Sequence, residues 1–351
     1  MKHLLTRLLP IGLLIIVLAG CAGPAPATAT PPADVTAAPT PSSQAPTADP
    51  TPEPTPTPDP TPVAATLAPE PDPLPWDKLP QPVGGYTLDT YPVVDGSTAT
   101  RPLSQALAYY YTGIRDMMQL EILADHTNTD ECFYRLVYGN VAVALAYEPS
   151  AETLEFVTDS YETHLEMQPI GRDALVFLVN EGNPIESLTI AQVQDIYQGK
   201  ITNWKQVGGA DLPIVAFQRP ERSGSQVMMS KLVMGDLPLA GAPGELMPQE
   251  MGDLIREVSA YSNEASAIGF TVFYYASEMY MEPGIKILPI EGVVPTVESI
   301  SKAEYPFIND FYAVVRADAE AGSDARKLFD TMRGPIGKQL IEAMGYAGIA
   351  E

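Results

Sequence analysis

The sequence contains few of the residue types that most metal centres and nucleophilic enzymes require. It has two cysteines, three histidines and two tryptophans among 351 residues. Zinc sites and activated nucleophiles are built from clusters of histidine, cysteine and carboxylate side chains. His3 lies in the first apolar segment, and His126 and His164 show no spacing to further ligands. The sequence therefore predicts no metal site and no cofactor.

Positive charge is also scarce. The chain carries 20 Lys and Arg against 44 Asp and Glu, which gives a formal net charge of −24. This balance argues against binding to nucleic acid or to anionic lipid surfaces. It does not argue against a small anion as ligand. Local donors act at hydrogen-bond distance, whereas surface carboxylates are screened beyond roughly 10 Å.

The chain begins with an apolar run that is too short to span a membrane comfortably. Lys2 and Arg7 precede the run, which extends from Ile11 to Ala19, and this order predicts an export signal over residues 1–20. The run ends in Leu-Ala-Gly-Cys, which resembles a bacterial lipobox. The resemblance implies cleavage before Cys21, lipidation of its thiol and an extracytoplasmic, membrane-anchored protein. An ordinary secretory signal with an unrelated cysteine is the alternative.

If the first cysteine is lipidated, Cys132 has no partner for an intrachain disulfide. We expect it to be a small buried apolar side chain rather than a reactive thiol.

Residues 21–75 consist largely of Pro, Thr and Ala with scattered Asp and Glu. This composition cannot bury enough apolar surface to fold, so we expect a disordered tether with polyproline II character. The remaining residues, 76–351, are enough for one large domain or two lobes with a core.

Strand-like and helix-like segments alternate along residues 76–351, which predicts an α/β fold. The expected strands are Val141–Ala146, Ala174–Val179, Pro213–Phe217, Ala267–Phe273, Lys286–Pro289 and Phe311–Val315. The expected helices are Gln105–Ala124, Ala151–Tyr161, Ile190–Gln198, Gln226–Met234, Gly244–Ala260 and Asp324–Met344.

One strand-to-helix turn has the composition of an anion site. The segment Gln218–Gln226 follows an expected strand and precedes an expected helix. The first N–H groups of a helix lack internal partners and favour negative charge. Ser223 and Ser225 add hydroxyls, Gly224 permits close backbone approach, and Arg219 offers a bidentate fork. The alternative is that Ser223 only caps the helix and Arg219 is a surface charge.

A second turn has a similar composition. The segment Asp95–Leu107 follows the strand-like run Tyr91–Val94 and contains Ser97, Thr98 and Thr100 before a helix with a proline near its start. Two such turns suggest two lobes, each directing a helix N-terminus at one ligand.

Several longer segments resemble the phosphate-binding subunit of bacterial phosphate ABC importers and its lipoprotein relatives. The segment Pro169–Gly209 contains Val-Asn at a strand end, then Asn-Pro, a Leu-Thr helix start and Gly-Lys-Ile-Thr-Asn-Trp. Ala265–Phe270 and Tyr305–Arg316 are similar to two further strands of that family. The resemblance covers most of residues 90–345. It implies a two-lobed type 2 periplasmic-binding-protein fold with an interlobe cleft, the first lobe at about 88–172 and 285–351 and the second at about 173–284.

The family's anion site can be carried over residue by residue. An Arg four residues before Ser-Gly-Thr corresponds to Arg219 before Ser-Gly-Ser, and a Gly/Ser/Thr turn corresponds to residues 96–98. The family's Asp at the end of a first-lobe strand is missing from Ala144–Ser150, where Glu148 is the nearest carboxylate and Asp95 is the other candidate. The expected ligand-binding residues are Ser97, Thr98, Glu148, Arg219, Ser223, Gly224 and Ser225.

These observations predict a lipid-anchored solute-binding protein that captures an oxyanion, inorganic phosphate, and presents it to an ABC permease without chemistry. A sensor or adhesion lipoprotein that reuses the fold is the alternative, favoured by the missing Asp. A tethered hydrolase is a third reading, although Arg-Ser-Gly-Ser-Gln is not the Gly-x-Ser-x-Gly elbow of hydrolases. If Glu148 replaces the Asp, phosphate should be strongly preferred to sulfate. If nothing replaces it, the two anions should bind comparably and weakly, and a sensor or another ligand would be the better account.

Overall fold

The computed structural model describes residues 74–349, except 160–163, 261–264 and 281. The export signal, Cys21 and nearly all of the tether therefore lie outside the described residues. Within the described part a mixed sheet has the strand order β1-β2-β7-β3-β5-β4, with β6 paired to β3. The strands are β1 (Val94–Gly96), β2 (Val143–Tyr147), β3 (Leu165–Asn180), β4 (Val215–Ala216), β5 (Ala267–Val272), β6 (Ile285–Leu288) and β7 (Ile308–Arg316).

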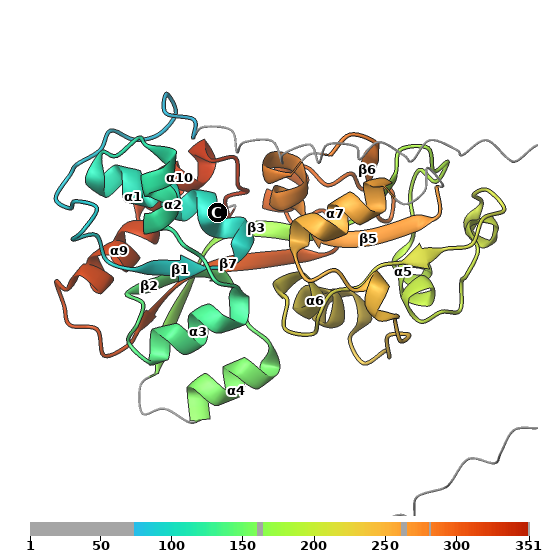
Figure 1. Cartoon of the computed structure of the whole chain (residues 1–351), viewed down its shortest axis with the longest axis horizontal. Helices are drawn as coiled ribbons and strands as arrows, with labels where there is room; N and C mark the ends of the chain where they lie inside the picture. The colour runs from blue at the N-terminus through green and yellow to red at the C-terminus, as the bar shows by residue number, and fades with distance from the viewer. Residues whose placement is uncertain (1–73, 160–163, 261–264, 281, 350–351) are drawn as a thin grey trace, which may run out of the picture. The chain divides into compact units, whose positions relative to one another are not determined.

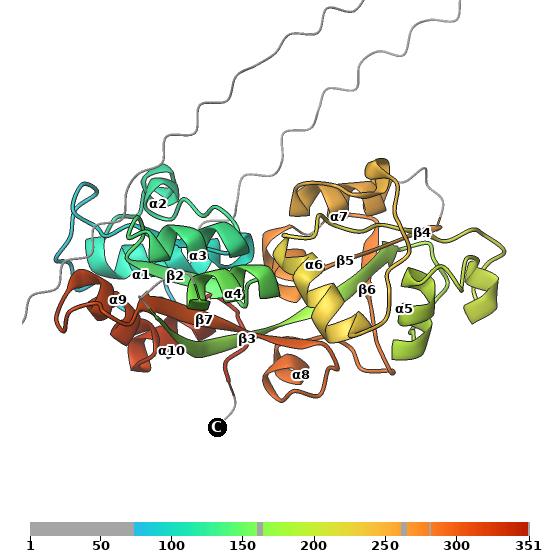
Figure 2. The same ribbon diagram turned by 90° about the horizontal axis from the view of Figure 1, so that it is seen from below.

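The long strand β3 joins two halves of this sheet. Its first part, through Ala174, pairs antiparallel with β7, and from Leu175 onward it pairs antiparallel with β5. β1 and β2 continue the sheet beyond β7, whereas β4 pairs with β5 and β6 pairs with the second part of β3. We call these halves, with the helices that cover them, the first and the second lobe. Figure 1 shows β3 and β7 passing between the lobes, and Figure 2 shows the same crossing from below.

Helices cover both halves of the sheet. The helical segments of the first lobe are η1 (Thr98–Thr100), α1 (Arg101–Thr112), α2 (Met117–Leu123), α3 (Thr129–Val137), α4 (Ala151–Asp159), α9 (Asp324–Met332) and α10 (Pro335–Ala343). Those of the second lobe are α5 (Ile190–Tyr197), η2 (Trp204–Val207), α6 (Gly224–Met228), η3 (Met229–Met234), η4 (Gly244–Leu246), α7 (Met251–Ala260) and η5 (Tyr275–Met279). The short helix α8 (Val297–Ser301) packs on β3.

The alternation of side chains in β2 separates two apolar clusters. Val143, Leu145 and Tyr147 face the large cluster, which includes residues of α1, α9 and α10. Ala144 and Ala146 face a smaller cluster that contains apolar residues of α3. All five are buried, because successive strand side chains point to opposite faces and helices cover both. The end of β2 is thereby held rigidly between two layers of helix.

The predicted α/β class is confirmed, but several expected elements have other bounds. The expected helix at 105–124 is two helices, since Gly113 adopts a left-handed φ of 73° after α1. The expected helix at 324–344 also breaks, at Gly334 and Pro335. Strand β3 has 16 residues and begins well before the expected start at Ala174. Helix α3 was not expected at all.

Two further expectations concern single features. Cys132 is a free, fully buried cysteine in α3, as expected, and burial raises the pKa of its thiol well above the ordinary value. Within residues 74–349 as described, none of the helices has both the length and the apolar character needed to cross a bilayer.

Candidate functional site

The two turns that were expected to face a ligand line the same small cavity between the lobes. Its volume is about 40 Å³, much smaller than the several hundred Å³ typical of organic-ligand sites, so it suits a small ion. The first lobe contributes residues from η1, the start of α3 and the end of β2, and the second lobe contributes residues around α6 and the start of α7. The lining residues are Ser97, Thr98, Asn128, Thr129, Tyr147, Arg219, Ser223, Gly224, Ser225 and Met251.

Arg219 is the charged group of the cavity, and only 5% of its surface is exposed. Its backbone N–H donates to Gln226 Oε1 at 2.9 Å, and its Nη2 donates to the carbonyl of Gln249 at 2.7 Å. The backbone bond holds the turn that carries Arg219, and the Nη2 bond holds the guanidinium. The Nε and Nη1 groups are buried and have no partner within the described part of the chain. Burial lowers the pKa of Arg219 from its ordinary value, although nearby Glu250 opposes this effect.

Helix α6 begins beside this guanidinium. Ser223 is its N-cap, and the hydroxyl of Ser223 accepts from the backbone N–H of Gln226 at 3.3 Å. Ser225 is fully buried, and its hydroxyl has no partner among the described residues. A buried donor without a partner costs about 1–3 kcal/mol, and more when it is charged. The unpaired groups of Arg219 and Ser225 are therefore suited to an anionic ligand.

The first-lobe side of the cavity is a hydroxyl pair. Ser97 Oγ accepts from the backbone N–H of Tyr147 at 3.0 Å and lies 2.8 Å from Thr129 Oγ1. Asn128 caps α3, since its Oδ1 accepts from the backbone N–H of Glu131 at 2.9 Å. The start of a nine-residue helix thus adjoins the cavity from the first lobe. This placement adds a partly positive helix end to the site.

His126 holds the first-lobe turn from behind. Its Nδ1 lies 2.8 Å from the carbonyl of Ser97, and its Nε2 lies 2.9 Å from Ser104 Oγ. Because a carbonyl only accepts, Nδ1 carries the proton and Nε2 accepts from the serine. Burial lowers the pKa of His126 to about 4, against a smaller raising effect of the Ser97 carbonyl. His126 is therefore neutral at pH 7 and positions Ser97.

Two glycines allow the close approaches on which the cavity depends. A Cβ on Gly96 would lie 1.9 Å from the carbonyl oxygen of Leu145, so β1 and β2 could not pair as they do. A Cβ on Gly224 would lie 2.5 Å from Thr129 Oγ1. Since Gly224 and Thr129 belong to different lobes, the second contact measures how closely the lobes approach each other.

None of the residues that line the cavity carries a carboxylate. Glu148 forms an ion pair with Lys231 across the cleft instead. Asp95 is buried behind the turn, where it accepts from the backbone N–H groups of Gly96 and Thr127, both at 2.7 Å, and pairs with Arg135. The sequence-based expectation that one of these two acids contacts the ligand thus stays a prediction, and the structure gives both of them other partners.

Six of the seven expected ligand-binding residues line the cavity, and four lining residues were not anticipated. Asn128 and Thr129 had a usable signal, because Asn followed three residues later by Glu is typical of a helix start. Tyr147 ends a strand that was expected to stop at Ala146. Met251 begins α7, and the sequence around it gives no signal for a site.

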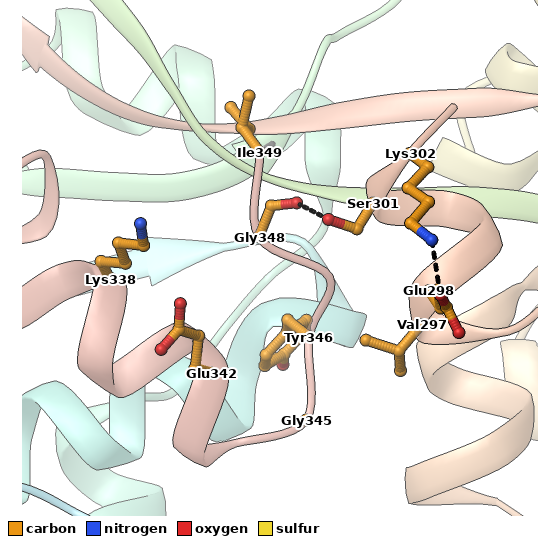
Figure 3. A pocket seen from close by; sticks show the side chains of 10 residues that line it. All are labelled: Val297, Glu298, Ser301, Lys302, Lys338, Glu342, Gly345, Tyr346, Gly348 and Ile349. Carbon is orange, nitrogen blue, oxygen red and sulfur yellow. Dashed lines mark hydrogen bonds and ion pairs between the residues drawn. The ribbon is translucent and has the colours of Figure 1, made fainter. Parts of the chain in front are cut away.

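A larger groove of about 740 Å³ lies between α8 and α10 and does not have the features of an anion site. Figure 3 shows Lys302 in an ion pair with Glu298, and the hydroxyl of Ser301 donating to the carbonyl of Gly348 at 2.7 Å. Two glutamates, Glu298 and Glu342, and two lysines, Lys302 and Lys338, line the groove, so it has no excess of positive charge. In the described ranges there is also no cluster of His, Cys, Asp and Glu that could hold a metal ion.

Comparisons with known proteins identify relatives of this chain. The family model of the PBP superfamily domain matches residues 82–331. The phosphate-binding protein PstS of Borreliella burgdorferi is 23% identical over 261 residues, which cover 73% of this chain and 89% of the relative. PstS of Bacillus subtilis is 22% identical over 259 residues, 74% of this chain and 80% of the relative. The crystal structure of an ABC-type phosphate transport receptor from Vibrio cholerae superposes with a TM-score of 0.54 at 23% identity, covering 72% of this chain and 98% of the receptor.

The expected type 2 periplasmic-binding-protein fold is thereby confirmed. Because the relatives are binding proteins, the expectation of a binding protein rather than an enzyme is confirmed as well. The family model spans well over half of the chain. The chain therefore belongs to the PBP superfamily.

Proposed function

We propose that this protein is an extracytoplasmic solute-binding protein that captures a tetrahedral oxyanion, inorganic phosphate, and delivers it to an ABC importer. The observation that carries the proposal is the set of unpaired buried donors on Arg219 and Ser225, two residues that line the same small cavity as Ser97. The names of the relatives, phosphate-binding proteins and a phosphate transport receptor, support phosphate as the ligand and ABC transport as the context.

The proposed ligand contacts follow from the geometry of the cavity. The Nε and Nη1 groups of Arg219 would bind two anion oxygens as a fork, and Ser225 Oγ together with the first N–H groups of α6 would bind a third. From the first lobe, Ser97 and Thr98 would complete the shell. Because groups of both lobes bind one ion, the ion would hold the lobes together. Charge-assisted hydrogen bonds of this kind contribute about 1.5–3 kcal/mol each.

We further propose that Cys21 is lipidated and anchors the protein to the outer face of the cell membrane through the tether at 21–75. Leu-Ala-Gly-Cys at residues 18–21 supports this step. The partners would be ABC permease subunits, with no role for nucleic acid. Cys21 and nearly all of the tether lie outside the described part of the chain.

Titration of the full-length protein, dialysed free of phosphate, with inorganic phosphate in a calorimeter tests the proposed function. We expect one site with submillimolar or tighter affinity and no turnover of a phosphate ester. No measurable phosphate binding would contradict the proposal. Release of phosphate from the ester would instead support a tethered hydrolase.

A sensor or adhesion lipoprotein is the second candidate, and the cavity lining without a carboxylate is the observation that favours it. Such a protein would bind the anion without passing it to a permease. Loss of phosphate uptake in cells that lack the protein would support the transport function, whereas unchanged uptake would favour the sensor.

A further inference from the structure

We propose that the cavity recognises tetrahedral oxyanions with fixed donors and rotatable hydroxyls and without a carboxylate, and therefore binds sulfate about as tightly as phosphate. This inference rests on the proposed function, and it specifies the class of anion that the site accepts. At neutral pH the phosphate ion carries a proton and sulfate carries none. A group that accepts a hydrogen bond and cannot donate one favours the protonated ion, and a carboxylate does so most strongly because its charge also repels an ion without a proton to share.

No carboxylate of the described residues lines the cavity, and four on its first-lobe side have other partners. On the second-lobe side Glu250 and Asp253 lie near Arg219 without lining the cavity, and Asp253 pairs with Arg256. Asp95 is fully buried, and its oxygens accept from Gly96, Thr127 and Arg135. Glu148 is engaged with Lys231. Asp130, beside the cavity residue Thr129, accepts from the backbone N–H of Ser150 at 2.8 Å and from its hydroxyl at 2.7 Å.

The fourth carboxylate, Asp173, lies behind the aromatic ring that closes the first-lobe side. Tyr147 is 1% exposed, and its hydroxyl donates to Asp173 Oδ2 at 2.7 Å. The other oxygen of Asp173 accepts from the backbone N–H groups of Ala174 at 2.7 Å and Tyr274 at 3.1 Å. The backbone N–H of Tyr147 binds Ser97, so the start of this side chain adjoins the site. At the end of β2, the chain thus places an aromatic ring against the site instead of an acid.

The acceptors that do line the cavity cannot make the distinction. The Asn128 carbonyl oxygen is used in the cap of α3. The remaining side-chain acceptors are the hydroxyls of serine and threonine residues, the Tyr147 hydroxyl, which is bound to Asp173, and the weakly accepting thioether of Met251. A hydroxyl rotates, so it accepts from the proton of phosphate or donates to an oxygen of sulfate. Arg219 and the backbone N–H groups donate to either ion.

Thr129 is the position at which a carboxylate can be restored with little change of volume. Its Oγ1 lies 2.8 Å from Ser97 Oγ, and it is the first residue of α3, where an acidic side chain is favourable. Thr129→Asp would bring a negative charge to the anion, and Thr129→Asn, of the same shape without the charge, is the matched control.

The experiment measures phosphate and sulfate binding to the full-length wild type and both variants by calorimetry at pH 7. We expect the two anions to bind the wild type within about tenfold of each other. In Thr129→Asp we expect the affinity for sulfate to fall by at least about a hundred-fold relative to that for phosphate. The proton of phosphate donates to the new carboxylate and offsets the repulsion, whereas sulfate meets the like charge without a hydrogen bond. In Thr129→Asn the ratio should stay within about tenfold.

Three outcomes would contradict either the predicted lack of selectivity between phosphate and sulfate or the proposed function. If the wild type binds phosphate but prefers it to sulfate by a hundred-fold or more, the present inference is wrong and the proposed function stands. If Thr129→Asp is no more selective than Thr129→Asn, a missing carboxylate is not the reason for the broad specificity. If the wild type binds neither anion, the proposed function itself fails.

Discussion

At the scale of single residues, the affinity of the site depends most directly on Arg219. Its guanidinium is buried, and one of its nitrogens is tied to a backbone carbonyl while two others are unpaired. We expect Arg219→Ala to weaken phosphate binding by about ten- to a hundred-fold or more, since hydrogen bonds to charged groups contribute about 1.5–3 kcal/mol each. Arg219→Lys should weaken binding less, because lysine retains the charge but not the planar fork. Calorimetric titration measures both losses.

Arg333→Ala is the matched control for this substitution. Arg333 is about half exposed and pairs with Asp330 on the surface of the first lobe, so its loss should leave phosphate affinity unchanged. Equal affinity of Arg219→Ala and wild type would show that the buried guanidinium does not contact the ligand.

Gly224 tests how closely the lobes approach each other. An alanine Cβ at this position would lie 2.5 Å from Thr129 Oγ1. Overpacking typically costs about 1–3 kcal/mol, so Gly224→Ala should weaken phosphate binding by about five- to a hundred-fold. In a Thr129→Ala background the same substitution should cost much less, because the nearest remaining atom, the Cβ of residue 129, is 3.5 Å away. A double-mutant cycle of binding constants measures this coupling, and purely additive effects would contradict the predicted clash.

At the scale of secondary-structure elements, sequence patterns predicted the turns of the site better than the helices around it. The composition around Arg219 and Ser97 predicted two segments that do line one cavity. Gly334 and Pro335 indicate the break in the expected helix at 324–344, since proline favours the first turn of a new helix. The apolar pattern continues across that break and conceals it.

Other features depended on tertiary structure that local patterns do not encode. Strand β3 extends through Gln168 and Pro169, which are poor indicators of a strand, because pairing with β7 stabilises it. The ion pair of Glu148 with Lys231 joins residues far apart in the sequence. Conformational preferences act within a few residues, so neither the length of β3 nor the partner of Glu148 could be predicted from them.

Two buried groups behind the site, Asp173 and His126, should change the free energy of unfolding in opposite directions as pH rises. Burial raises the pKa of Asp173 from 3.8 to about 6, against lowering effects of its hydrogen bonds from Tyr147 and backbone N–H groups. The native state then holds a proton that the unfolded state has lost, so about 3 kcal/mol of stability is lost as pH rises from 4 to 6. His126, with a pKa lowered from 6.5 to about 4, acts in the opposite sense. Between pH 4 and 6.5 the unfolded state binds the extra proton, so this group adds about 3 kcal/mol as pH rises.

We therefore expect the two single variants to shift the pH profile in opposite directions. In Asp173→Asn the free energy of unfolding, measured by urea titration relative to wild type, should increase as pH rises from 4 to 6. In His126→Gln the same difference should decrease. The many exposed carboxylates contribute equally to each variant and to wild type, so they cancel in the difference. Flat difference profiles would show that neither buried group titrates in this range.

At the scale of the whole molecule, anchoring and lobe closure decide whether the site can serve transport. Cys21→Ser should abolish labelling with palmitate and release the protein from the membrane, because the thiol that carries the lipid is lost. Labelling of living cells, followed by separation of membrane and soluble fractions, measures both effects. Cys132→Ser is the matched control, since Cys132 is buried in α3 and should not affect labelling. A Cys21→Ser protein that remains in the membrane would contradict the lipid anchor.

Two ion pairs cross the cleft and should favour the closed arrangement of the lobes. Lys231 pairs with Glu148, and Arg222 pairs with Glu152 at 3.0 Å. Their side chains are about one-third to two-thirds exposed, and exposed pairs contribute about 0.2–1 kcal/mol each. Lobe closure is a shift between two populations, so a pair that forms only in the closed arrangement raises anion affinity by the same free energy.

Glu148→Gln separates this role in closure from the contact with the ligand that the sequence suggested. If Glu148 only pairs with Lys231, the variant should bind phosphate and sulfate about two- to fivefold more weakly, and by the same factor, because closure does not depend on which anion is bound. The loss should disappear at about 1 M salt, where the screening length falls to about 3 Å. Glu298→Gln, which removes an exposed pair on α8 away from the cavity, should change neither affinity. Calorimetric titration of both anions at low and high salt distinguishes the two roles. If Glu148→Gln changes the ratio of phosphate to sulfate affinity, this carboxylate contacts the anion instead.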